Sequence, residues 1–183
     1  MDMETGLERK FCRAGETLSR GEGAVIAGYA SLFGAGDTGG DVVAEGAFAA
    51  SLARLAAGGG RVRMLWQHDP REPIGVWDEV REDKKGLRVR GRLLEAVARG
   101  REAAALLAAG AIEGLSIGYR VKRAHRDAAG RRVLEEIELW EVSLVTFPML
   151  PSARVAAKED AGAVALREMA QVFETARRSL AGD

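Results

Sequence analysis

Several residue types that support whole classes of protein chemistry are scarce in this 183-residue chain. It holds one cysteine, Cys12, and two histidines, His68 and His125. A single cysteine excludes an internal disulfide framework and a cysteine-only metal cluster, and it favours a reducing, intracellular environment. Two scattered histidines do not have the ligand spacing of a zinc site. We therefore expect neither a metal nor a cofactor.

Charge of one sign and long apolar runs are also missing. Lys+Arg and Asp+Glu both total 27, so the chain has no overall positive field to attract nucleic acid or an anionic membrane. No stretch approaches ~18 uninterrupted apolar residues. The first residues are polar and acidic, where a signal peptide is basic and then apolar. We expect no specific nucleic-acid partner, no membrane span and no export by that route.

The remaining composition is that of an ordinary globular protein. Hydrophobic residues make up 47% of the chain and charged residues 30%, which is enough for one domain with a core and a tail. The composition changes after Pro151, and residues 158–180 carry apolar residues at helical spacing. We therefore divide the chain into an N-terminal segment (1–22), a main domain (23–155) and a C-terminal helical tail (156–183).

Short alternating segments predict strands, and two segments have the spacing of helices. Strands are expected at 24–32, 61–67, 74–80, 87–94, 115–122 and 133–147, and helices at 45–57 and 95–112. Polar spacers make two consecutive strand pairs into hairpins, so the expected fold class is α+β, mainly β, with a mixed or antiparallel sheet. Pro70 should end the strand before it, because proline cannot donate to a ladder, and this leaves His68 at or near a strand end.

Ser116 lies between Gly114 and Gly118, where a helical pattern gives way to an alternating one. Glycines on both sides permit the close approach of another backbone, and a hydroxyl can be presented to a substrate there. The alternative is structural: Gly114 ends a helix, Gly118 forms a bulge and Ser116 is a small buried residue. We exclude an α/β-hydrolase nucleophile elbow, because that fold requires strand, sharp turn and helix in that order.

A nucleophilic serine needs a base within hydrogen-bond reach and a third group that orients the base. His68, at a predicted strand end, is the better candidate base. His125 lies among charged residues at a predicted hairpin tip, where we expect it to be solvated.

Glu141 is a candidate for the orienting acid. Period-two alternation puts it on the same face as Leu139 and Ser143, a mostly apolar face, whereas Glu138 shares its face with Trp140. A carboxylate among apolar neighbours costs free energy unless it is paired, which favours a specific partner for Glu141. A solvent-facing glutamate at a strand edge remains the alternative.

Five motifs in this order resemble those of one known family. They are Gly28-Tyr29-Ala30-Ser31-Leu32-Phe33, Gly46-Ala47-Phe48, Trp66-Gln67-His68-Asp69 with Pro73-Ile74-Gly75, Gly114-Leu115-Ser116-Ile117-Gly118-Tyr119, and Glu141-Val142-Ser143-Leu144-Val145-Thr146-Phe147-Pro148. Over about residues 23–151 the chain resembles the prohead (capsid maturation) proteases of HK97-type tailed phages, which are similar in fold to the herpesvirus assemblins. The resemblance implies a mostly antiparallel β-barrel flanked by helices, with 23–155 as the protease domain.

The same resemblance implies roles for individual residues. Ser116 takes the position of the nucleophile and His68 that of the base. The assemblins use a second histidine as the third member, and this chain has none at the corresponding strand. Glu141 is therefore our inference for the third member, with Ser143 and Glu138 as fallbacks. Backbone amides in the turn after Phe147 are the candidates for stabilising the oxyanion.

The function implied by the resemblance is that of a serine endopeptidase in phage head maturation. It would cleave the scaffolding region of the major capsid protein, and itself, inside the immature capsid in the cytoplasm of the bacterial host. A phage-like particle such as a gene transfer agent would need the same enzyme. The expected partners are the major capsid protein with its scaffolding segment and further copies of the chain. The alternative is a non-catalytic capsid-assembly module that binds coat protein on the same fold.

Overall fold

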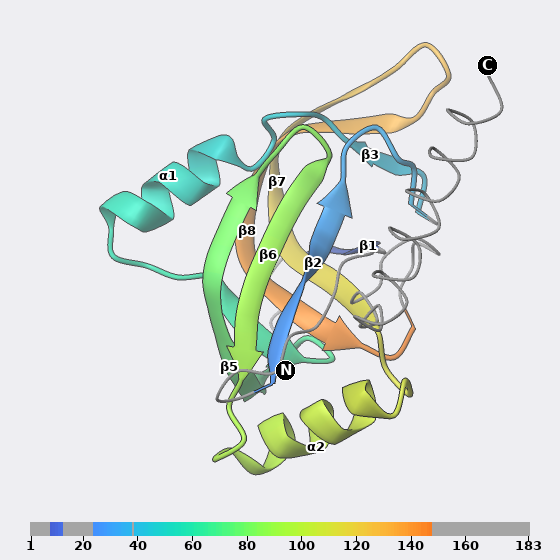
Figure 1. The fold of residues 1–183 in the computed structure, drawn as a ribbon. Helices are drawn as coiled ribbons and strands as arrows, with labels where there is room; N and C mark the ends of the chain where they lie inside the picture. The colour runs from blue at the N-terminus through green and yellow to red at the C-terminus, as the bar shows by residue number, and fades with distance from the viewer. Residues whose placement is uncertain (1–7, 13–23, 38, 148–183) are drawn as a thin grey trace, which may run out of the picture.

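The computed structural model describes residues 8–12, 24–37 and 39–147, and these residues form one curled sheet with two helices packed against it (Figure 1). The strands are β1 (Glu8–Cys12), β2 (Val25–Leu32), β3 (Asp41–Val43), β4 (Arg63–Trp66), β5 (Asp69–Glu82), β6 (Gly86–Leu93), β7 (Gly114–Arg126) and β8 (Arg132–Val145). The helices are α1 (Ala49–Ala57), beside β8, and α2 (Ala98–Ala108), beside β5 and β6. The mainly β fold with flanking helices is confirmed.

The strand order is β1-β7-β8-β4-β5-β6-β2, and β3 pairs with β8 outside this path. The predicted hairpins β5–β6 and β7–β8 are both present and antiparallel. Two parallel pairings, β3 with β8 and β4 with β8, were not predicted. β1 was also missed; it lies in the segment predicted as an N-terminal extension, and it pairs with β7. The predicted C-terminal tail (156–183) and the predicted turn after Phe147 lie outside the described residues.

One predicted strand end has a different cause. β4 ends at Trp66, before a two-residue turn, and Pro70 is the second residue of β5 rather than a strand terminator. The prediction that Pro70 ends the strand was therefore wrong. Proline is tolerated at the beginning of a strand, where its missing N–H removes little from the ladder.

Both helices begin later than predicted, at Ala49 and Ala98, and α2 also ends earlier, at Ala108 rather than at 112. Glycine follows the end of each helix. Gly110 has φ +70 and follows α2, and its N–H donates to the carbonyl of Leu107 while that of Ala111 donates to Leu106. This pair of bonds is the Schellman motif, which satisfies the last carbonyls of a helix. Gly59, with φ +63, follows α1 in the same way.

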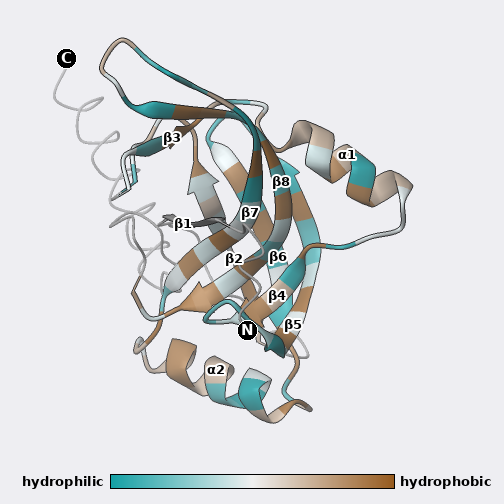
Figure 2. Ribbon diagram, turned by 180° about the vertical axis from the view of Figure 1, so that it is seen from behind, coloured by the Kyte–Doolittle hydropathy of each residue, from teal (hydrophilic) through white to brown (hydrophobic). Residues whose placement is uncertain are grey.

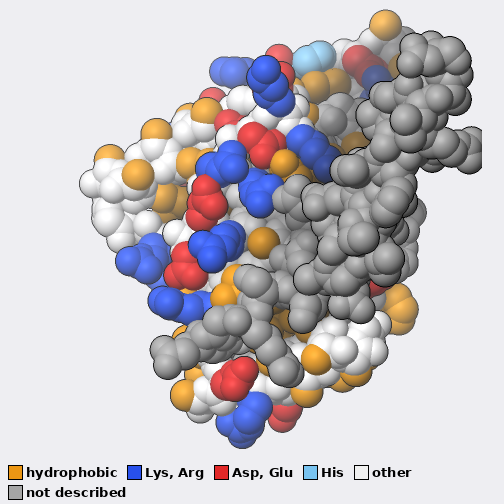
Figure 3. Space-filling model, in the orientation of Figure 1, with side chains coloured by type: hydrophobic (Ala, Val, Ile, Leu, Met, Phe, Trp, Pro, Cys, Tyr) orange, Lys and Arg blue, Asp and Glu red, His pale blue; other side chains and the backbone are white. Residues whose placement is uncertain are grey.

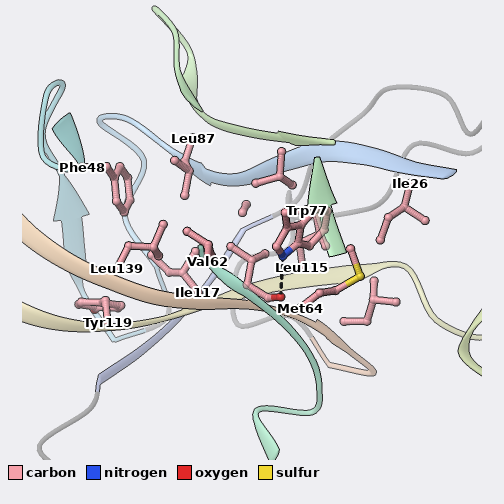
Figure 4. Packing of buried hydrophobic residues seen from close by; sticks show 14 of the residues in the cluster. Ile26, Phe48, Val62, Met64, Trp77, Leu87, Leu115, Ile117, Tyr119 and Leu139 are labelled. Carbon is pink, nitrogen blue, oxygen red and sulfur yellow. Dashed lines mark hydrogen bonds between the residues drawn. The ribbon is translucent and has the colours of Figure 1, made fainter. Parts of the chain in front are cut away.

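Apolar and polar residues alternate along the strands, as the colour bands of Figure 2 show. The buried apolar residues form one core cluster. Outward-facing side chains on β5 and β6 are mostly charged, with both signs interspersed (Figure 3). Inside, Leu115 and Ile117 of β7 pack near Met64 of β4 and Trp77 of β5 (Figure 4). The Trp77 indole N–H donates to the carbonyl of Val142 at 3.2 Å, so this large ring is buried with its polar atom satisfied.

The core leaves no room for a side chain at Gly91 of β6. A Cβ there would lie 2.3 Å from the Val76 carbonyl oxygen, 2.7 Å from the Trp77 ring and 2.8 Å from the Met64 methyl group. We expect Gly91→Ala to lower the free energy of unfolding by about 2 kcal/mol, as overpacked cores do. Urea denaturation monitored by circular dichroism measures the change.

Gly36 is the matched control, because a Cβ there meets nothing within 4 Å and its φ is not in the left-handed region. Gly36→Ala should leave the urea midpoint nearly unchanged. Equal midpoints for the two variants would mean that the close packing around Gly91 relaxes without cost.

Candidate active site

The sheet brings together side chains that are far apart in the sequence. Ser116 lies on β7, Glu141 and Ser143 lie on β8, and His68 lies in the turn between β4 and β5. β8 runs between β7 and β4, with Ser116 opposite Ser143 and Gly118 opposite Glu141. The four polar side chains therefore meet above β8, the strand that carries Glu141, with β7 on one side and β4 on the other.

The turn that carries His68 has an unusual backbone. Trp66 pairs with Asp69, which leaves Gln67 and His68 as a two-residue hairpin loop. Both have positive φ, 52° and 63°, as the central residues of a type I′ turn do. Such angles cost on the order of 1 kcal/mol for a residue other than glycine, and strain of this kind gathers at functional sites. The Gln67 N–H donates to the carbonyl of Leu144 at 2.9 Å, which ties the turn to β8.

Ser116, His68 and Glu141 form a hydrogen-bond relay. The distance from Ser116 Oγ to His68 Nε2 is 2.6 Å, and that from His68 Nδ1 to Glu141 Oε1 is 2.5 Å. A carboxylate accepts only, so we assign the ring proton to Nδ1, which leaves Nε2 free to accept from the serine hydroxyl. The His68 and Glu141 side chains are each 4% exposed, and Ser116 is fully buried. Little water competes with these bonds, which strengthens them.

Ser143 connects the acid to the backbone of the histidine. Its hydroxyl donates to Glu141 Oε2 at 2.5 Å and accepts the His68 N–H at 3.2 Å. The network is thus a closed ring that runs from the His68 imidazole through Glu141 and Ser143 to the His68 backbone. Both carboxylate oxygens have a donor, so Glu141 is held in one orientation.

A register shift in β8 places Glu141 on the outer face. Gly118 pairs with Glu141, but the next residue, Tyr119, pairs with Leu139, so Trp140 is an extra residue on β8. Paired residues share a face and successive residues alternate, so Glu141 and Leu139 lie on opposite faces. The prediction that they share a face was wrong, because a β-bulge interrupts the period of two. The prediction that Glu141 and Ser143 lie on the same face of β8 is correct.

Gly118 provides the space for the acid. A Cβ at this position would overlap the Glu141 carboxylate, because it would lie 2.1 Å from Oε1, far inside van der Waals contact. The sequence predicted a close approach here, and the approaching group is the Glu141 side chain rather than another backbone. Nothing in the sequence near residue 118 indicates which side chain fills that space.

The other candidate residues lie elsewhere. The Glu138 carboxylate is 2.8 Å from Lys122 Nζ, and this hydrogen bond holds the pKa of Glu138 below its ordinary value. The His125 side chain is 51% exposed, with Nδ1 3.0 Å from Glu135 Oε1, as expected for a solvated histidine. The structure therefore brings neither Glu138 nor His125 to the Ser116 site.

Within 8–12, 24–37 and 39–147, no three His, Cys, Asp or Glu side chains gather in a way that could hold a metal ion. Neither helix in those ranges is long and apolar enough to cross a membrane.

Ser143 is a hydrogen-bond partner of Glu141. The only sign of this contact in the sequence was that Ser143 stands two residues after Glu141, on the same face of the strand.

The chain is similar to known phage proteins over most of its length. The chain is 36% identical over 140 residues to the prohead protease of Enterobacteria phage HK97, a match that covers 75% of this chain and 61% of that protein's length. Its structure resembles that of the bacteriophage T4 capsid assembly protease, with a TM-score of 0.65 over 76% of this chain and 96% of that one. At 15% identity, this second likeness concerns the fold alone.

A family match covers most of the sequence. Residues 12–168 match the family described as caudovirus prohead serine protease. This span includes Ser116, His68, Glu141 and Ser143, and it also includes all five motifs from which the family was predicted. The chain belongs to the caudovirus prohead serine protease family.

Proposed function

We propose that this chain is a serine endopeptidase of phage or phage-like head maturation, with Ser116 as nucleophile, His68 as base and Glu141 as the orienting acid. Its substrates are the scaffolding region of the major capsid protein and the chain itself. It acts inside the immature capsid, in the cytoplasm of the bacterial host. The observation that carries the proposal is the buried relay from Ser116 Oγ through the His68 ring to Glu141.

The geometry supports a definite sequence of steps. The Ser116 hydroxyl attacks the scissile carbonyl as its proton passes to His68 Nε2, and Glu141 stabilises the imidazolium through Nδ1–H. The imidazolium then protonates the leaving amine, the C–N bond breaks, and an acyl-enzyme remains on Ser116. Water, activated by His68, hydrolyses the acyl-enzyme, and the serine regains its proton.

The energetic cost of the arrangement favours a catalytic role over a structural one. A buried histidine and carboxylate contribute less to stability than apolar side chains of the same volume would. The turn that holds His68 has positive φ at two successive residues that are not glycine, Gln67 and His68. A non-catalytic capsid-assembly module would need neither the relay nor this turn.

Co-expression with the coat protein tests the proposal. Mass spectrometry of coat protein from the resulting particles should detect a product shortened by its scaffolding region when the chain is present. Coat protein that stays full-length beside folded chain would favour the non-catalytic module.

Ser143 is a positioning residue in this scheme. Ser143→Ala removes the donor to Glu141 Oε2 and the acceptor of the His68 N–H, so the acid loses one of its two hydrogen bonds. We expect kcat to fall about thirtyfold with KM nearly unchanged, as the loss of one charge-assisted hydrogen bond implies. Steady-state peptide hydrolysis at a series of pH values measures kcat, KM and the pH dependence of kcat.

Ser143→Thr is the matched variant, because it keeps the hydroxyl. It should recover most of the lost kcat and the wild-type pH profile. If Ser143→Ala lowers only the unfolding midpoint, and leaves kcat and the pH profile unchanged, Ser143 has a structural role alone.

A further inference from the structure

A groove with an unusual surplus of arginine lies between α1 and β8. It has a volume of about 510 Å³, within the range of ligand-binding sites. α1 and the segment that leads from it to β4 arch alongside β8 and form one wall (Figure 2). We call this surface the arginine groove and define it by Arg54, Leu55, Arg61, Arg63 and Trp140.

The positive charge of the groove is not neutralised within the described part of the chain. Arg61 and Arg63 form no ion pair with any described acid, and Arg54 has a long pair with Glu136, at 3.6 Å. The acid that lines the groove, Glu138, is already held by Lys122 at 2.8 Å. At least two guanidinium groups therefore face this space with their donors available to a ligand.

The outer surface of β5 and β6 is different. Outward-facing arginines of β5 and β6 alternate with acids (Figure 3), and they form pairs such as Arg81 with Glu79 at 2.6 Å and Arg92 with Asp78 at 3.4 Å. The whole chain has a formal net charge of zero. The arginine groove is thus a local feature, and a general basic character of the protein does not account for it.

The groove also offers apolar contact. Trp140 is 46% exposed, which is unusual for a tryptophan. The Arg120 guanidinium lies 5.4 Å from the centre of the Trp140 ring. Leu55 of α1 lines the facing wall. An exposed tryptophan beside arginines is the composition of a binding hot spot in protein recognition.

The arginine groove adjoins the proposed catalytic residues. Arg63 of β4 is the direct partner of Glu141 in the β4–β8 pairing, and Trp140 precedes Glu141 on β8. The backbone of the groove-lining residue Arg63 therefore lies one strand spacing, about 4.8 Å, from that of Glu141.

We propose that the arginine groove binds an acidic segment of the polypeptide substrate, with carboxylates on Arg61 and Arg63 and an apolar side chain against Trp140. This inference rests on the proposed function only in naming the bound segment as part of a substrate. The apolar wall favours a peptide over a nucleic acid, because phosphate-binding surfaces need positive charge and gain nothing from Leu55.

A binding measurement that involves no cleavage tests the groove. The full chain with Ser116→Ala is titrated against a fluorescein-labelled peptide of alternating glutamate and leucine, and anisotropy is recorded. Adding Arg61→Gln and Arg63→Gln should weaken binding about tenfold, as the loss of two half-exposed ion pairs implies. Added salt should weaken binding to the unaltered groove, and a peptide with glutamine for glutamate should bind far less.

Arg81→Gln with Arg92→Gln is the matched control, because it removes the same charge from two arginines of β5 and β6 that are paired with acids. It should leave the affinity unchanged. Absence of binding, equal affinity in the groove variant, or tighter binding of single-stranded DNA at the same groove would each overturn the inference. Cleavage of coat protein by the wild-type chain is scored separately, so failure of the groove and failure of the proposed protease activity are distinct results.

Discussion

Replacement of Ser116 by alanine is expected to lower kcat/KM for coat-protein cleavage by about 10⁵-fold while the chain keeps its fold. In the proposed mechanism the Ser116 hydroxyl attacks the carbonyl, and its Oγ lies 2.6 Å from His68 Nε2, which would accept its proton. Ser116 is fully buried in β7, and alanine is smaller and fits the same strand. A time course of coat-protein cleavage gives the rate, and circular dichroism gives the fold.

Ser31→Ala is the matched control for this variant. Ser31 is also fully buried on a strand, β2, and its Oγ has no hydrogen-bond partner among the described residues. The control removes the same atom from the same kind of environment, so its cleavage rate should equal that of the wild-type chain. Cleavage by Ser116→Ala at the wild-type rate would reject Ser116 as the nucleophile.

Glu141→Gln should reduce kcat by about 10⁴-fold with little change in KM. The carboxylate accepts the His68 Nδ1–H, which leaves Nε2 unprotonated and able to receive the serine proton. A glutamine amide can donate to Nδ1 instead, and the ring then carries its proton on Nε2, where it blocks the transfer. The imidazolium that forms during attack also loses its counter-charge. Steady-state kinetics with a peptide substrate separates kcat from KM.

Glu138→Gln is the control for the assignment of the acid. Glu138 lies three residues earlier on the same strand and pairs with Lys122 rather than with His68. Its kcat should stay within about twofold of the wild-type value, as expected for a solvated surface pair. If Glu138→Gln stops cleavage and Glu141→Gln does not, the acid has been assigned to the wrong residue.

The elements that surround the site were predictable because each depends on its own local sequence. The alternation around Ser116 and Glu141 predicted β7 and β8, and the polar residues between them predicted a hairpin. Candidates for the nucleophile and the base could be chosen because the chain has only two histidines and one serine placed between glycines near a strand start. β3 was missed because its three residues carry too short a pattern to detect.

The details of the site could not be predicted in the same way. Period-two alternation put Glu141 beside Leu139, and only the paired strand reveals that Trp140 is an extra residue. The parallel pairing of β4 with β8, which brings His68 over the acid strand, joins segments some 75 residues apart. No local spacing encodes a contact of that kind.

The sequence by itself determined the family, the mainly β composition, the end of α1 at Ala57, and the choice of Ser116 and His68 as candidates. The tertiary structure alone decided the face on which Glu141 lies, the positive-φ turn that carries His68, the bridging position of Ser143 and the gathering of Arg54, Arg61 and Arg63 around one groove. Local patterns reflect forces between residues a few positions apart. Register, bulges and the meeting of distant strands depend on which segments pair, and that is settled when the whole sheet closes around its core.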